Sequence, residues 1–212
     1  MGRVQLVKSI IHGMLAYSFH VYVWPRKLVR MLDRWIKKII WSGGILTSKL
    51  CMVFWKHLCL PWKAAGLDLK PSRFVNEALI LQLIWKLLSE DSQWACLLLS
   101  QFSSHGRPIT HYFKSSVWSG MKPMVDTVQD NSAWIVGNGE RINFWTDNWL
   151  GVPLVDTLQI TVEFCLSISC TGQMAIRSGQ IELPAFVRDN AIVVAQVFEI
   201  TIPRSSLPDQ FV

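Results

Sequence analysis

The chain of 212 residues is long enough for one domain or two small ones, and half of it is hydrophobic, which allows a sizeable core. Its net charge of +6 is uneven, because residues 1–63 carry 11 Lys or Arg with Asp33 as their only acid (+10), whereas residues 64–212 carry 10 Lys or Arg with 14 acids (−4). The five cysteines, an odd number without regular spacing, argue against a disulfide framework, and the basic surplus indicates an anionic partner for the first third.

Residues 2–24 are predicted to form a buried helix that packs against the next one. Its apolar face has helical spacing: Val4, Val7, Ile11, Met14 and Leu15. A run of 17 residues without formal charge, from Ser9 to Pro25, lies at the lower limit of a membrane span. Basic flanks and two histidines weaken that interpretation, and no small-residue cleavage site of a secretory signal follows. A membrane anchor therefore stays a minor alternative.

The segment from Pro25 to Trp41 predicts an amphipathic helix. Proline suits the first turn, where its missing N–H costs nothing, and Gly43 and Gly44 supply a stop. At about 100° per residue, six cations share a sector of roughly 120°: Arg26, Lys27, Arg30, Arg34, Lys37 and Lys38. The apolar side holds seven residues: Leu28, Val29, Leu32, Trp35, Ile36, Ile39 and Ile40.

Six like charges on one helical face repel each other, so helix energetics alone do not favour this arrangement. A solvated surface helix is the simplest interpretation, and an anionic partner is the sharper one. Phosphates spaced along a duplex or hybrid backbone suit cations spaced along a helix. A membrane surface or a calmodulin-like groove suits the same pattern.

The middle of the chain is predicted to be mostly helical. Leu50 to Leu60 is apolar enough for a strand or a short buried helix, and the segment from Pro61 to Leu67 is typical of a turn. Ser115 or Ser116 is able to cap the last of the expected helices. The expected elements that follow the turn are a helix over 71–90, a helix over 93–102, a loop over 103–108 and a helix over 115–128.

The clearest β signal lies in a tryptophan-rich segment. Trp134–Val136 and Ile142–Trp145 flank an Asn-Gly pair within Gly137–Glu140, which predicts a β-hairpin. Asp147, Asn148 and Trp149 close it. Simple packing explains the tryptophans at least as well as a binding role does. In the remaining residues 151–212, the stretch from Ala191 to Thr201 is apolar, and periodicity does not decide between a strand and a buried helix.

The sequence contains few residues arranged for chemistry. Cys51, His57 and Cys59 lack the paired spacing of a zinc site, and Cys165 and Cys170 have no histidine nearby. No P-loop, dinucleotide fingerprint, nucleophile elbow or Asp-Asp pair occurs. Asp147 stands alone, and structural hydrogen bonding explains it better than metal binding. Neither catalysis by this chain nor a cofactor is expected.

A series of different short motifs runs along nearly the whole chain in a characteristic order. The early ones are Gly2-Arg3 with Leu6–Ile10, Trp41–Gly44, Trp55, Cys59–Pro61, Gly66-Leu67, Asn76–Leu79, Trp85-Lys86 and Ser116–Trp118. The most specific block is Val136–Gly139, Ile142, Phe144-Trp145 and Asp147–Trp149, and Leu183-Pro184 and Asp209–Val212 follow it. In this order they resemble part of a plant non-LTR (LINE-type) retrotransposon reverse transcriptase.

The resemblance implies where the chain sits in such a protein. The polymerase palm with its catalytic aspartates would precede residue 1. The Cys/His zinc-binding segment, and often a ribonuclease H domain, would follow residue 212. The chain would then be a non-catalytic thumb and connector, nuclear if the family's role is retained. Ala65 and Asp68 stand where the family usually has glycine, which puts the turn geometry in doubt if positive φ is needed there.

The expected fold is α+β and mostly α. Its parts are a basic helical thumb-like segment (1–63), a helical connector (64–130), a Trp-rich hairpin (131–150) and a mixed tail (151–212). The expected function is contact with the phosphate backbone of RNA, DNA or an RNA–DNA hybrid through the six cations of residues 26–38. The alternatives are a non-functional retroelement relic and a membrane-surface-associated helical protein.

Overall fold

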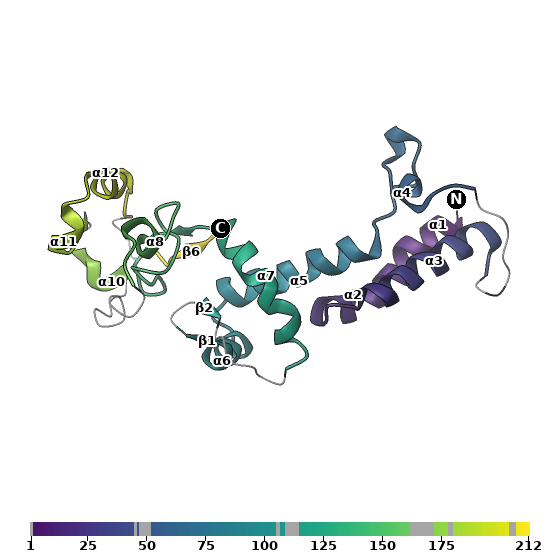
Figure 1. The fold of residues 1–212 in the computed structure, drawn as a ribbon, viewed down its shortest axis with the longest axis horizontal. Helices are drawn as coiled ribbons and strands as arrows, with labels where there is room; N and C mark the ends of the chain where they lie inside the picture. Colours follow the sequence, from purple (N-terminus) through teal and green to yellow (C-terminus); the bar gives the residue numbers. More distant parts are fainter. Residues whose placement is uncertain are drawn as a thin grey trace. The chain divides into compact units, whose positions relative to one another are not determined.

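In the computed structural model the chain is mostly helical, with short antiparallel strand pairs, which confirms the predicted α+β class (Figure 1). The structure describes residues 2–44, 46, 52–104, 107–108, 115–161, 172–177, 180–203 and 207–212. The described residues fall into two compact units. The first comprises Met1–Trp85 and Phe113–Met124, and the second comprises Lys86–Tyr112 and Val125–Val212.

The first unit is built from helices. In chain order they are α1 (Gly2–Leu6), the π-helical turn η1 (Val7–Ile11), α2 (His12–Val21), α3 (Arg26–Ser42), α4 (Trp55–Leu58), the 3₁₀ turn η2 (Trp62–Ala64) and most of α5 (Ser72–Ser89). The expected helices over 25–41 and 71–90 are thus confirmed, within a residue or two at each end. The segment predicted as a strand or a short helix contains α4; its residues 50 and 51 lie outside the described part.

The core of the first unit joins α1 and η1 to α3. Val7 and Ile36 are almost fully buried, and Leu58 and Leu69 pack into the same cluster. In Figure 1, α1 and α2 lie alongside α3, so the predicted packing of residues 2–24 on the basic helix is confirmed. The burial of these residues drives the packing, at roughly 25 cal/mol per Å² of apolar surface.

The prediction for Met14, one residue of the apolar face expected within residues 2–24, was wrong. Val4 and Val7 are buried as expected, but Met14 is 77% exposed. The cause is η1, because a π-helical turn accommodates one extra residue and rotates everything after it relative to a straight α-helix. Phe19, which was not predicted, is buried instead and packs edge-on against Trp24.

The turn between α4 and α5 has an unusual backbone. Ala65 (φ 58°) and Asp68 (φ 53°) adopt the left-handed region. Four backbone hydrogen bonds enforce it, from the N–H groups of residues 65–68 to the carbonyls of Trp62, Pro61, Leu58 and Leu60. The sequence expectation that these two positions suit glycine is therefore confirmed by the geometry. A left-handed conformation costs a non-glycine residue about 1–2 kcal/mol.

Replacing Ala65 with glycine should raise the free energy of unfolding by about 1 kcal/mol, because the relief of strain exceeds the entropy that glycine adds to the unfolded chain. The midpoint of urea unfolding measures it. The neighbouring Ala64, in η2 with an ordinary backbone, is the matched control. Ala64→Gly should lower stability, by about 0.5–1 kcal/mol. Equal losses at both positions would contradict a strained Ala65.

Within its described residues, the second unit combines short helices with three antiparallel strand pairs. Its helices are α6 (Gln93–Phe102), the second half of α7 (Trp118–Asp130), whose first half belongs to the first unit, α8 (Leu154–Leu158), α10 (Gly172–Ala175), α11 (Ala185–Arg188) and α12 (Ala191–Glu199). Its antiparallel pairs are β1 (Ser103–Ser104) with β2 (Arg107–Pro108), β3 (Trp134–Ile135) with β6 (Gln210–Phe211), and β4 (Ile176–Arg177) with β5 (Gln180–Ile181).

Several predicted elements of this half are settled by the structure. The helix over 93–102 is confirmed, and the loop predicted over 103–108 contains the β1–β2 pair instead. The helix predicted over 115–128 begins three residues later, at Trp118, whose N–H is capped by the Ser115 hydroxyl at 3.1 Å. The undecided stretch from Ala191 is helical, because Asn190 caps it through the N–H groups of Ile192 and Val193.

The predicted Asn-Gly hairpin was wrong. Trp134 and Ile135 do not pair with residues 142–145; they pair with Phe211 and Gln210, near the other end of the unit. The predicted turn residues, 137–141, instead fold around the buried Asp209 carboxylate. It accepts the N–H groups of Gly137 (2.7 Å), Gly139 (2.8 Å) and Arg141 (2.9 Å). Three hydrogen bonds to one charged acceptor outweigh the local preference for a two-residue turn.

The tryptophans of this segment pack in the core. Trp145 and Trp149 are almost completely buried with Phe144, and the Trp149 indole N–H donates to the Phe144 carbonyl at 2.8 Å. The Phe144 and Trp145 rings meet edge to face, 4.9 Å between centroids. The simple packing interpretation is sufficient for these residues.

Candidate nucleic-acid interface

Both ends of α3 are set by local chemistry. Pro25 precedes the first turn, and its carbonyl accepts from Leu28 and Val29. At the other end Gly43 is left-handed (φ 80°), and its N–H donates to the Ile39 carbonyl. The helix therefore begins and ends where the sequence indicated.

An arginine that the sequence did not single out for this role also holds the end of α3. The Arg3 guanidinium donates to the carbonyls of Ile40 (3.3 Å) and Trp41 (3.4 Å). A cation at a helix C-terminus satisfies its last carbonyls and complements its dipole. Arg3 therefore helps to hold α1 on the end of the basic helix.

The six predicted cations lie along α3, and five of them are exposed. Lys37 is the exception and is half-buried. None of the six forms an ion pair with another residue in the part of the chain that the structure describes. We call this set of six the basic face: Arg26, Lys27, Arg30, Arg34, Lys37 and Lys38. In the described part of the chain these cations have no ion-pair partner, although Asp33 lies on the same helix.

Asp33, the only acid of α3, forms a hydrogen bond to another helix. The Asp33 carboxylate accepts the backbone N–H of Ser72, the first residue of α5, at 3.2 Å. On the opposite side of the helix Val29 and Ile36 are buried, whereas Leu28 and Trp35, which the sequence assigned to the apolar side, are 42% and 39% exposed. The predicted apolar face is thus narrower in the structure.

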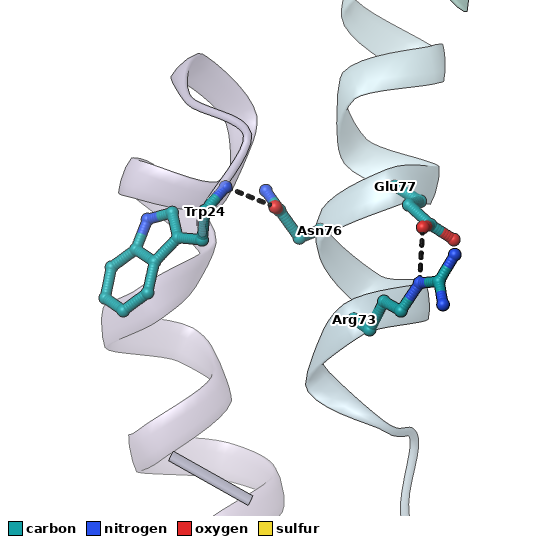
Figure 2. A network of polar contacts seen from close by, with 4 residues as sticks. All are labelled: Trp24, Arg73, Asn76 and Glu77. Atoms are coloured by element: carbon teal, nitrogen blue, oxygen red, sulfur yellow. Dashed lines mark hydrogen bonds and ion pairs between the residues drawn. The ribbon is translucent and has the colours of Figure 1, made fainter. Parts of the chain in front are cut away.

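Asn76 fixes the approach to the basic helix. Figure 2 shows its amide oxygen accepting the Trp24 N–H at 2.9 Å. Its amide nitrogen donates to the carbonyls of Phe19 (2.9 Å) and Tyr22 (2.8 Å). Asn76 is only 3% exposed, so all three backbone groups depend on it. Local sequence patterns do not indicate this role, because it depends on contacts with residues 52 to 57 positions away.

Two cations outside the basic face form ion pairs. On α5 the Arg73 guanidinium contacts the Glu77 carboxylate at 2.6 Å, one helical turn away (Figure 2). Lys8 lies 3.6 Å from Asp68. These two pairs separate structural cations from the unpaired ones of the basic face.

Asp147 is held by the backbone. Its carboxylate accepts the Asn143 N–H at 2.8 Å, and the Asn143 side chain accepts the N–H groups of Trp145 and Thr146. Burial raises the pKa of Asp147 to about 6, while the Asn143 hydrogen bond opposes the shift. No group of three or more possible metal ligands occurs among the described residues.

We expect the raised pKa of Asp147 to make stability fall as pH rises. Between pH 4 and 6 the folded state binds more protons at this carboxyl than the unfolded state, so ionisation destabilises the fold by about 3 kcal/mol at pH 7. Asp147→Asn should therefore gain stability over the natural chain as pH rises from 4 to 7. Urea unfolding across that range measures the difference.

The control for this prediction is Asp126→Asn, which removes an exposed carboxylate from α7. Its difference from the natural chain should stay flat over the same pH range. A flat difference for Asp147→Asn would show that Asp147 titrates alike in the folded and unfolded chains.

The remaining predicted chemistry is sparse. Cys59 and Cys96 are free thiols, and burial raises the pKa of Cys59 to about 11. The other three cysteines lie outside the described residues. Among the helices of the described segments, none has the length and apolar content that a membrane crossing requires.

The described residues thus form a mostly helical α+β fold in which the cations of the basic face of α3 have no ion-pair partner. No protein-family model and no solved structure matches it. The chain is similar to a curated protein of Arabidopsis thaliana named "Putative ribonuclease H protein", with 29% identity over 163 residues. The match covers 73% of this chain and 26% of that protein, so the chain corresponds to about a quarter of its relative's length.

Proposed function

We propose that this chain is a retroelement-related segment that contacts the phosphate backbone of nucleic acid through the basic face of α3. The observation that carries the proposal is the set of six cations on one helix without an ion pair among the described residues. A plant relative named for ribonuclease H, an activity on nucleic acid, supports the choice of partner. The sequence resemblance to a reverse transcriptase thumb and connector supports the same role.

The proposed contact is independent of sequence and carries no chemistry of its own. Lysine and arginine on a helix surface reach phosphates rather than base edges, which fixes position without reading sequence. Catalysis would belong to segments of a longer protein, because this chain has no Asp-Asp pair for two-metal nucleotidyl transfer. A nuclear location follows if the role of such a protein is retained.

The test is binding of the full chain to a labelled RNA–DNA hybrid over a salt series. If the six cations contact phosphates, log affinity should fall linearly with log salt, by about 0.7–0.9 per phosphate contacted. Arg30→Glu with Arg34→Glu should weaken binding to hybrids of different sequence alike and reduce the slope. Affinity that does not change with salt would overturn the proposal.

The matched control is Lys70→Glu with Lys86→Glu. Both lysines are exposed and lie outside α3. Replacing two cations with two glutamates changes the net charge by the same amount as in the α3 double variant. This double variant should lose much less affinity than the α3 variant. Equal losses would indicate a general effect of net charge, and the basic face would then be a solvated surface.

The relic alternative is favoured by one observation, the left-handed Ala65 and Asp68 at positions where glycine is unstrained. A chain under no selection accumulates such substitutions. Loss of cooperative unfolding, together with rapid proteolysis throughout, would support the relic and count against a retained binding surface.

A further inference from the structure

The segment Phe54–Ala64, which contains α4 and η2, exposes aromatic rings between cations. Phe54 is 72% exposed and Trp62 is 50% exposed, whereas the neighbouring Trp55 is half-buried and packs on the core cluster. The charged and titratable residues of the segment are exposed as well: Lys56, His57 and Lys63. Exposed rings of this size within a basic segment indicate a binding surface rather than leftover core.

The segment is held firmly enough to present these rings. Leu58 is buried in the core cluster with Leu69 immediately after the turn. The backbone bonds from Leu67 to Leu58 and from Asp68 to Leu60 close the segment at 2.9 and 2.8 Å. These bonds and the core contact hold the backbone that carries Phe54 and Trp62 in one conformation. Less conformational entropy is therefore lost when a ligand binds.

Each aromatic ring also has a titratable or basic neighbour. The Phe54 and His57 rings meet edge-on, 6.1 Å apart, and the Lys8 ammonium lies 6.0 Å from the centre of the Trp62 ring. Two acids lie close to the segment: Asp68, which is paired with Lys8, and Asp33, whose charge acts on Cys59. A surface that binds single-stranded nucleic acid has two components: aromatic rings that stack on bases and cations that contact phosphates.

We propose that Phe54 and Trp62 stack on unpaired bases, so that this segment binds single-stranded nucleic acid in addition to the backbone contact of α3. The inference rests on the proposed function and deepens it. A duplex keeps its bases stacked inside, so exposed rings add affinity only for unpaired nucleotides. The partner is thus a strand with free bases, RNA or DNA.

The experiment compares three labelled probes with the full chain: a single-stranded RNA, the same sequence as DNA, and a blunt RNA–DNA hybrid. Phe54→Leu with Trp62→Leu should weaken single-strand binding at least tenfold, because stacking contributes about 1–3 kcal/mol per base. Binding of the blunt hybrid should be unchanged. If the variant weakens binding to only one of the two single-stranded probes, the surface is specific for that nucleic acid, RNA or DNA.

Matched variants keep the test sharp. Phe74→Leu with Phe198→Leu removes two rings that are 62% and 81% exposed elsewhere, and single-strand binding should be retained. Trp62→Phe keeps a ring and should retain most of the binding, which excludes misfolding as the cause of a loss. Equal loss in the Phe74 and Phe198 variant would overturn the assignment to this segment.

The outcomes separate this inference from the proposed function. Single-strand binding that needs Phe54 and Trp62, without hybrid binding that needs Arg30 and Arg34, supports the stacking surface and overturns the α3 contact. The reverse result overturns the stacking surface alone. If the leucine variant instead loses binding to phosphatidylserine vesicles and not to single strands, the segment is a membrane-surface contact and the inference fails.

Discussion

Replacing Asp209 with alanine should lower the free energy of unfolding by about 4 kcal/mol, because three backbone N–H groups lose one buried, charged acceptor. The β3–β6 pair begins at Gln210, the residue after Asp209, so the same substitution also loosens the start of that pair. The thermal midpoint should fall by roughly 10 °C or more in a chain of this size. Differential scanning calorimetry measures it.

Two further variants test the cause of that loss. Asp209→Asn keeps an oxygen acceptor but turns an amide nitrogen toward one of the N–H donors, so an intermediate loss is expected. Asp189→Ala removes an exposed carboxylate from the same unit and should change stability by less than about 0.5 kcal/mol. An Asp209→Ala chain as stable as the Asp189→Ala chain would show that the loop is held by packing.

Replacing Asn76 with alanine should cost about 3 kcal/mol, since the carbonyls of Phe19 and Tyr22 and the Trp24 N–H lose their partner in a buried site. Because Asn76 holds the residues that lead into α3, hydrogen exchange should accelerate over residues 19–24 before the rest of the first unit. Asn76→Asp should cost at least as much, because a carboxylate would face two carbonyl oxygens.

The control for Asn76 is Asn131→Ala, since the Asn131 amide donates to a single carbonyl in an exposed position. Its effect should be within about 0.5–1 kcal/mol of zero. Hydrogen exchange that rises equally throughout the first unit in the Asn76 variant would mean that Asn76 supports the whole unit and has no special role at the entry to α3.

The basic helix could be predicted from the sequence because all its determinants are local. Pro25 and Gly43 set its ends through backbone geometry, and the positions of its cations follow from helical periodicity alone. The expectation for Ala65 and Asp68 came instead from the resemblance, which implies glycine at these two positions, and the structure gives both residues a positive φ. The binding role of the six cations stays a prediction.

Other features depended on contacts that no local pattern reveals. The Asn-Gly pair indicates a hairpin, yet Trp134 finds its strand partner in Phe211 because Asp209 satisfies the intervening loop from a distance in sequence. Met14 fits a helical face by spacing, but the π-helical turn before it changes the phase. Arg3 and Asn76 act through tertiary hydrogen bonds, which periodicity does not encode.

The bond between Asp209 and Gly137 has a consequence for how the chain folds during synthesis. These residues are 72 positions apart, and a Cβ at Gly137 would collide with the backbone carbonyl of Leu207, so the loop and the segment 207–212 can only form together. A ribosome releases residues 207–212 long after the tryptophan-rich segment. Residues 137–141 therefore lack the Asp209 carboxylate until then, and the second unit completes its fold only after residues 207–212 have been synthesised.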